Sequence, residues 1–237
     1  GRPAGEMQVI SGGDSVVVRY HHVDRQRGPR VETRYRMVSG EAVGGRTWQL
    51  PLYGPEPAPR PDPADQFEIA RDSVFWMVRD STRGVRRQAG AYYRLRSNTP
   101  YDIALMARHL LRQPNRSALL LPSGIARAEI VADTVIGTGR ARQRVKLVMV
   151  HMGTFPVASG VWLDASDSLV AGQVGWFITV RRGREHLLPA LRAIEVAYRN
   201  THGEALARSV APPPARAIAI VNGDVFDSEA GVMLPRT

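Results

Sequence analysis

Alternation of apolar and polar residues is the main pattern in this chain. Between positions 31 and 37, Val31, Thr33, Tyr35 and Met37 alternate with charged side chains. A period of two is typical of an antiparallel strand with one buried face and one solvated face. A β-branched run at 15–20 precedes this segment, and a Gly-Pro turn separates the two. The pattern therefore predicts a β-hairpin.

Strand patterns recur through the rest of the chain. A second hairpin is predicted from residues 160–164 and 169–174, with residues 165–168 as its turn. A strand with a basic face is expected at 140–151, where arginines and Lys146 occupy every second position. The remaining predicted strands lie at 67–71, 73–78, 90–95, 126–131, 134–136 and 175–180.

Two segments change to helical spacing. Thr99 precedes Pro100, and this pair favours a helix that Thr99 caps and that begins with proline. Apolar residues follow at helical spacing until Pro114. The longest helical pattern runs from 185 to 208. The chain is therefore predicted to be α+β and mainly β, with a curved antiparallel sheet or half-barrel and two helices.

Prolines mark a long loop and a domain boundary. Residues 50–63 contain six prolines and predict an extended surface loop. Residues 211–216 predict a rigid linker that follows an N-terminal β-rich domain of residues 1–210. Beyond the linker, 217–221 and 225–227 predict two short strands. Since two strands alone are not a stable unit, residues 217–237 are expected to require further strands from downstream sequence or another chain.

Composition limits the chemistry. The chain has no cysteine, so disulfides and thiolate metal sites are excluded. No apolar stretch is long enough for a membrane span. The net charge is +10, and Lys146 is the only lysine. Such a charge suits nucleic acid, but a bias towards arginine in the coding sequence also explains it. Because no basic run is interleaved with stacking aromatic residues, nucleic-acid binding is the least favoured reading.

No catalytic or metal-binding motif is found. The six histidines include neither His-x-His nor HExxH, the spacings that a hydrolytic zinc site requires. No metal, cofactor or catalytic residue is therefore predicted in this chain. Gly137 and Gly139 predict a turn rather than a dinucleotide-binding loop. Asp224 and Asp227 are interpreted as residues of a turn and a strand end.

The candidate surface for a ligand or partner combines aromatic and basic side chains. The aromatic residues would line a cavity of the half-barrel, or alternatively pack in its core. The basic residues would be solvated, or would contact an acidic partner. The set consists of Trp76, Tyr92, Tyr93, Trp162, Trp176, Arg140, Arg142 and Arg144.

The C-terminal residues resemble a known family. An apolar strand at 218–221 is followed by Asn222, the segment Val225-Phe226-Asp227, and a Gly231-x-x-x-Pro235 motif. This order is similar to the opening of imidazolonepropionase-like members of the amidohydrolase superfamily. The resemblance implies the first strands of a small β-sandwich that flanks a catalytic (β/α)-barrel. The barrel would carry the metal ligands of the family, with zinc or another divalent metal, and none of these ligands is in this chain.

Residues 1–210 resemble the β-rich N-terminal extensions of some exported members of that family. The features that carry this similarity are Leu-Leu-Pro-Ser-Gly at 120–124 and Val-Trp-Leu-Asp at 161–164. The Trp-Leu-Asp and Gly-Trp segments are also similar to the curved sheet of lipoprotein-carrier-like domains. The chain begins without a signal-peptide pattern, as a mature exported protein does, and a periplasmic or extracellular location is expected.

Two functions are therefore predicted. The first is a non-catalytic portion of an exported, metal-dependent amidohydrolase that hydrolyses an amide or another C–N bond. Its partner would be the catalytic barrel, as a domain or as the second chain of a cleaved precursor, and a higher oligomer is left open. The alternative is a separate half-barrel module that binds a lipid or another apolar ligand.

Overall fold

The computed structural model describes residues 4–55, 62–78, 81–86, 88–139, 142–153, 157–210 and 221–235. Most of them lie in strands, and the α+β, mainly β class predicted from the sequence is confirmed. The chain divides into two units, residues 1–195 and 196–237, and the boundary falls within the second α-helix. The predicted linker at 211–216 lies outside the described residues.

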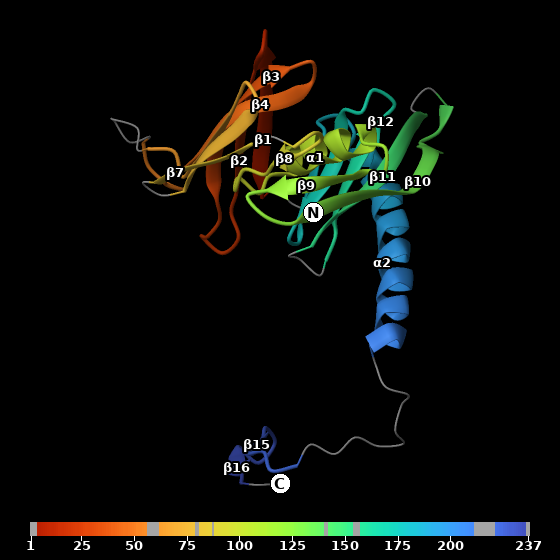
Figure 1. The fold of residues 1–237 in the computed structure, drawn as a ribbon. Coiled ribbons are helices and arrows are strands. Elements are labelled where there is room, and N and C mark those ends of the chain that lie inside the picture. The colour runs from red at the N-terminus through yellow and green to blue at the C-terminus, as the bar shows by residue number, and fades with distance from the viewer. Residues whose placement is uncertain are drawn as a thin grey trace. The chain divides into compact units, whose positions relative to one another are not determined.

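The first sheet has seven strands in the order of the sequence, each antiparallel to its neighbours (Figure 1). The hairpin predicted near the N-terminus supplies its second and third strands. The strands are β1 (Gly5–Gly12), β2 (Ser15–His22), β3 (Arg30–Val38), β4 (Glu41–Gln49), β5 (Asp65–Ala70), β6 (Ser73–Val78) and β7 (Ser81–Arg86).

The second sheet also has seven strands, in the order β14-β13-β12-β11-β10-β9-β8. Its strands are antiparallel except for β8 and β9, which are parallel. The two strands predicted at 126–131 and 134–136 form one strand, β10, with a bulge between Ile130 and Ala132. The strands are β8 (Tyr92–Tyr93), β9 (Ser117–Leu121), β10 (Ile125–Ile136), β11 (Gln143–Met152), β12 (Ser159–Asp164), β13 (Leu169–Val174) and β14 (Phe177–Val180).

Helix α1 (Pro100–Arg112) lies between the two sheets, as Figure 1 shows. Thr99 caps it and Pro100 is its first residue, so the predicted start is confirmed. Met106 and Leu110 pack in the core of the second sheet, whereas Leu105 packs in the core of the first. A helix that is apolar on two sides is expected in such a position, because both sides are buried.

Two polar residues of α1 attach it to the first sheet. The Asp102 carboxylate accepts a hydrogen bond from the Tyr35 hydroxyl of β3. His109 Nδ1 lies 2.9 Å from Glu41 Oε2 of β4, and its Nε2 lies 2.8 Å from the carbonyl oxygen of Gly90. Asp102 and His109 are seven residues apart, so they lie on the same side of the helix, two turns from each other.

A 3-10 turn, η2 (Glu185–Leu187), leads into α2 (Leu188–Val210). The predicted helix at 185–208 is thereby confirmed. Leu187, Leu191 and Glu195 are buried in the first unit, whereas residues 200–210 are all exposed. The apolar spacing in the sequence therefore describes the first turns of α2 better than its C-terminal half.

The second unit contains a two-stranded antiparallel hairpin of β15 (Val225–Asp227) and β16 (Val232–Leu234). The strand predicted at 225–227 is confirmed. Its partner, however, is Val232–Leu234, and residues 217–220 of the other predicted strand lie outside the described residues. Asp227 Oδ1 accepts backbone hydrogen bonds from Glu229 and Ala230, at 2.9 and 3.0 Å, which closes the turn.

Candidate ligand-binding cleft

The edge strands of the two sheets approach each other at one end of the first unit. The rings of His22, at the end of β2, and Phe177, at the start of β14, have centroids 4.1 Å apart. Burial raises the pKa of the Tyr20 hydroxyl, and a side-chain hydrogen bond with Thr179 of β14 opposes this rise. Together these contacts fix the separation between β1–β2 and β14.

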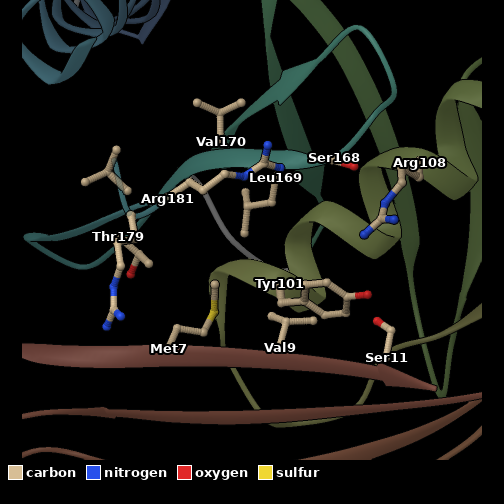
Figure 2. Close-up of a pocket in the computed structure, with 12 residues that line it drawn as sticks. Met7, Val9, Ser11, Tyr101, Arg108, Ser168, Leu169, Val170, Thr179 and Arg181 are labelled. Atoms are coloured by element: carbon tan, nitrogen blue, oxygen red, sulfur yellow. The ribbon is translucent and has the colours of Figure 1, made fainter. Parts of the chain in front are cut away.

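Beyond this contact the sheets leave a cleft of about 410 Å³ (Figure 2). Its volume falls within the range of small-molecule binding sites, roughly 300–1,000 Å³. Three segments that are distant in the sequence surround it. The cleft is lined by Met7, Val9 and Ser11 of β1, Tyr101 and Arg108 of α1, and Ser168, Leu169, Val170, Thr179, Val180, Arg181 and Arg182 around β13 and β14.

One side of the cleft is apolar because of the strand period. Met7, Val9 and Ser11 are two residues apart, so their side chains leave β1 on the same face. Figure 2 shows these three side chains directed towards Tyr101 and Leu169. Val9 is 39% exposed although β1 belongs to a seven-stranded sheet, since this part of its face borders the cleft rather than a filled core.

Arginines supply the charge at the cleft. Arg181 Nη1 lies 3.0 Å from Asp164 Oδ2, and Arg182 Nη2 lies 3.9 Å from Glu6 Oε1. Burial tends to raise the pKa of Asp164, but hydrogen bonds from Ser166, Ser168 and Arg181 outweigh it and the pKa is lowered. Asp164 is therefore ionised at neutral pH and holds Arg181 beside the opening.

Arg108 is placed differently from the other two arginines. Its Nε donates to the Ala104 carbonyl oxygen at 3.2 Å, and its Cζ lies 5.4 Å from the ring centroid of Tyr101. The side chain is half-buried. Within the part of the chain that the structure describes, no carboxylate pairs with this guanidinium.

The aromatic residues proposed from the sequence do not line this cleft. Trp76 and Tyr93 pack in the core of the first sheet, and Tyr92 packs in the core of the second. Trp162 is 2% exposed, whereas Trp176 is 79% exposed in the turn between β13 and β14. These five side chains therefore do not meet in one cavity.

The described arginines proposed from the sequence, Arg142 and Arg144, do not line the cleft. Arg144 is exposed on β11, and its Nε lies 2.9 Å from Asp133 Oδ1 of β10. Arg142 is exposed as well. Arg140 lies outside the described residues. The sequence singled out none of the cleft residues, because most of them belong to ordinary strand or helix patterns and the others, Ser168, Arg181 and Arg182, lie in turns.

The described residues contain neither a candidate metal site nor a membrane-spanning helix. Among them, no group of three or more His, Asp or Glu side chains is arranged to hold a metal ion. In the same residues, no helix is long and apolar enough to cross a membrane. Comparisons with protein-family models, with curated proteins and with solved structures gave no match. The function is therefore inferred from the chain itself.

Proposed function

We propose that this chain is a non-catalytic portion of an exported, metal-dependent amidohydrolase-type hydrolase, with the catalytic barrel in downstream sequence or in a second chain. The observation that carries the proposal is the hairpin β15–β16, which contains part of the segment that resembles the family, Val225–Asp227 and Val232–Leu234. The Asp227 carboxylate and Gly231 form the turn of this hairpin. The structure of the turn therefore explains why the motif contains Asp and Gly at these positions.

Both faces of this hairpin are apolar and exposed. Directly paired residues share a face, so Phe226 and Met233 lie on one side, and Val225 and Leu234 lie on the other. Their exposed fractions are 61, 57, 45 and 41%. Strands that are apolar on both faces are typical of sheets that are covered on both sides. This supports a role for the hairpin as part of a larger sandwich.

The test is purification of the protein from its complete gene, followed by intact-mass analysis and a denaturing gel. A catalytic barrel that is joined to this chain or co-purifies with it is expected, together with metal-dependent hydrolysis of a C–N bond. The double variant Phe226→Ser/Met233→Ser should weaken the association or lower the stability of the joined barrel. Val135→Ser, which replaces an apolar side chain that is 47% exposed on β10, is the control. A gene that encodes no barrel would overturn the proposal.

A second candidate function is the binding of an apolar ligand by the β-rich unit. The observation that favours it is the cleft between β1, α1 and β13–β14, whose apolar wall contains Met7, Val9 and Leu169. This function is compatible with the first, because a hydrolase can carry a binding module. The test is a titration of the protein with a single-chain amphiphile such as dodecanoate or 1-decanol.

A further inference from the structure

We infer that the cleft between β1, α1 and β13–β14 binds a single-chain amphiphile with an anionic head group, with the head at Arg108 and the chain along β1. This inference rests on the second candidate function and adds the charge of the ligand and the residues that select it. It assigns the ligand to side chains other than the aromatic residues that the sequence suggested.

The position of Arg108 is the reason for proposing a ligand with an anionic head group. A guanidinium that is half-buried loses part of its hydration. An anionic ligand would replace the lost water contacts with charge-assisted hydrogen bonds. Arg108 Nε is already used by Ala104, which leaves the terminal nitrogen atoms of the guanidinium for a ligand. Arg181 and Arg182 also line the cleft, but they are paired with the carboxylates of Asp164 and Glu6, so Arg108 is the arginine to which we assign the anionic head group.

The shape of the cleft lining is the reason for proposing a ligand with a single alkyl chain. The side chains of Met7 and Val9 lie along β1, and Leu169 faces them from β13 (Figure 2). They form an apolar trough beside the basic group, and Tyr101 lies between the trough and Arg108. Ser11 and Ser168 provide hydroxyl groups near the charged end. A ligand with one alkyl chain and one anionic group matches this division into an apolar part and a basic part.

The experiment is isothermal titration calorimetry of the whole chain with dodecanoate below its micelle concentration. Dodecyltrimethylammonium and 1-decanol serve as the cationic and neutral probes. We expect saturable binding of dodecanoate, weaker binding of the alcohol, and no binding of the cation. Arg108→Gln should weaken dodecanoate binding by about tenfold or more, because it removes a charge-assisted contact. Val9→Asp should abolish it.

Arg127→Gln is the matched control, because Arg127 is exposed on β10 and does not line the cleft. Thermal unfolding of each variant shows whether it is folded, and Arg108→Gln and Val9→Asp probe the cleft independently. Equal binding of the alcohol with no effect of Arg108→Gln would overturn the anionic head group while the second candidate function stands. Failure of all three probes would overturn both. Binding only to vesicles of dioleoylphosphatidylglycerol would assign the site to a membrane surface and overturn a free amphiphile.

Discussion

The Tyr35 hydroxyl donates a hydrogen bond to the Asp102 carboxylate, and this buried contact joins β3 to the first turn of α1. The same carboxylate accepts hydrogen bonds from the Ser97 hydroxyl and, at 2.9 Å, from the backbone N–H of Thr99. Asp102 therefore completes the helix cap and also attaches the helix to the first sheet. The position of α1, and with it one wall of the cleft, depends on this carboxylate.

Replacement of Tyr35 by Phe should destabilise the protein by about 1–3 kcal/mol, since it leaves a buried carboxylate with one donor fewer. The measurement is urea unfolding followed by circular dichroism. Tyr53→Phe is the control, because Tyr53 is 61% exposed and its hydroxyl can bond to water. Equal stability of the two variants would show that the contact with Asp102 contributes nothing.

The raised pKa of Asp102 should be visible in the pH dependence of the free energy of unfolding. Burial raises the pKa of Asp102 above its ordinary value of 3.8, although the hydrogen bonds from Ser97 and Tyr35 oppose this. The folded state then binds the proton more tightly than the unfolded state. This contribution to stability is complete below the ordinary pKa and is lost as the pH rises through the raised value.

Asp102→Asn removes the titration of this carboxyl group. A comparison of the wild-type protein with this variant therefore isolates the contribution of Asp102 to the pH dependence of stability. Between about pH 3.5 and about pH 7 the wild-type protein should lose unfolding free energy relative to the variant. The measurement is a series of urea titrations of both proteins across this range. Parallel curves for the two proteins would contradict the raised pKa, because the other groups titrate equally in both.

Local patterns in the sequence were sufficient to predict the helix start and many of the strands, but β7 and β9 were not predicted, and only Tyr92–Tyr93 of the strand expected at 90–95 is a strand. The alternation at 31–37 predicts β3, and Thr99 with Pro100 predicts the N-terminus of α1. The division of the strands into two seven-stranded sheets was not predicted, because sheet membership depends on contacts between distant segments. The polar residues Asp102 and His109, seven positions apart in an apolar helix, were the available signal that α1 is attached to a second surface.

The cleft could not be predicted in the same way. Val9, Tyr101 and Leu169 meet there, yet each fits the ordinary period of its own strand or helix. The aromatic residues proposed instead are large apolar side chains, and four of the five are buried by packing. Only the fold brings the edge strands β1 and β14 together, so only the fold reveals the cavity beside them.

At Glu32 the alternation of apolar and polar residues in β3 gave the wrong burial. It lies on the polar side of the pattern, yet it is 1% exposed. Its carboxylate is paired with Arg19 Nε at 3.0 Å and Arg34 Nε at 2.8 Å, and both arginine side chains are half-exposed. The pairing covers the carboxylate, and a cavity of about 360 Å³ borders it on the outer face of the first sheet.

The double variant Arg19→Gln/Arg34→Gln should therefore cost about 3 kcal/mol, since it leaves a buried carboxylate without two of its cationic partners. Glu32→Gln should cost less than half as much, because the two arginines remain accessible to water. Urea unfolding measures both. The control is Arg144→Gln, which breaks an exposed pair with Asp133 and should not change the unfolding midpoint. The opposite ranking of the first two variants would contradict burial of the Glu32 charge.

Gly45 on β4 tests how tightly the core of the first sheet is packed. A Cβ atom added there would lie 2.7 Å from Leu95 Cδ1, 2.9 Å from Phe67 Cε1 and 3.2 Å from Tyr35 Cδ1. These atoms belong to buried side chains, which can move only by displacing their neighbours.

Gly45→Ala is therefore expected to destabilise the protein by about 1–3 kcal/mol, the usual cost of overpacking. The measurement is urea unfolding, with thermal unfolding as an independent check. Gly12→Ala is the matched control, because Gly12 also lies in a strand and a Cβ there would meet nothing within 4 Å. If Gly45→Ala were as stable as the control, the packing of β4 against Leu95 and Phe67 would be looser than these distances indicate. The helix α1 would then be positioned mainly by its polar contacts through Asp102 and His109, rather than by the core on which Leu105 packs.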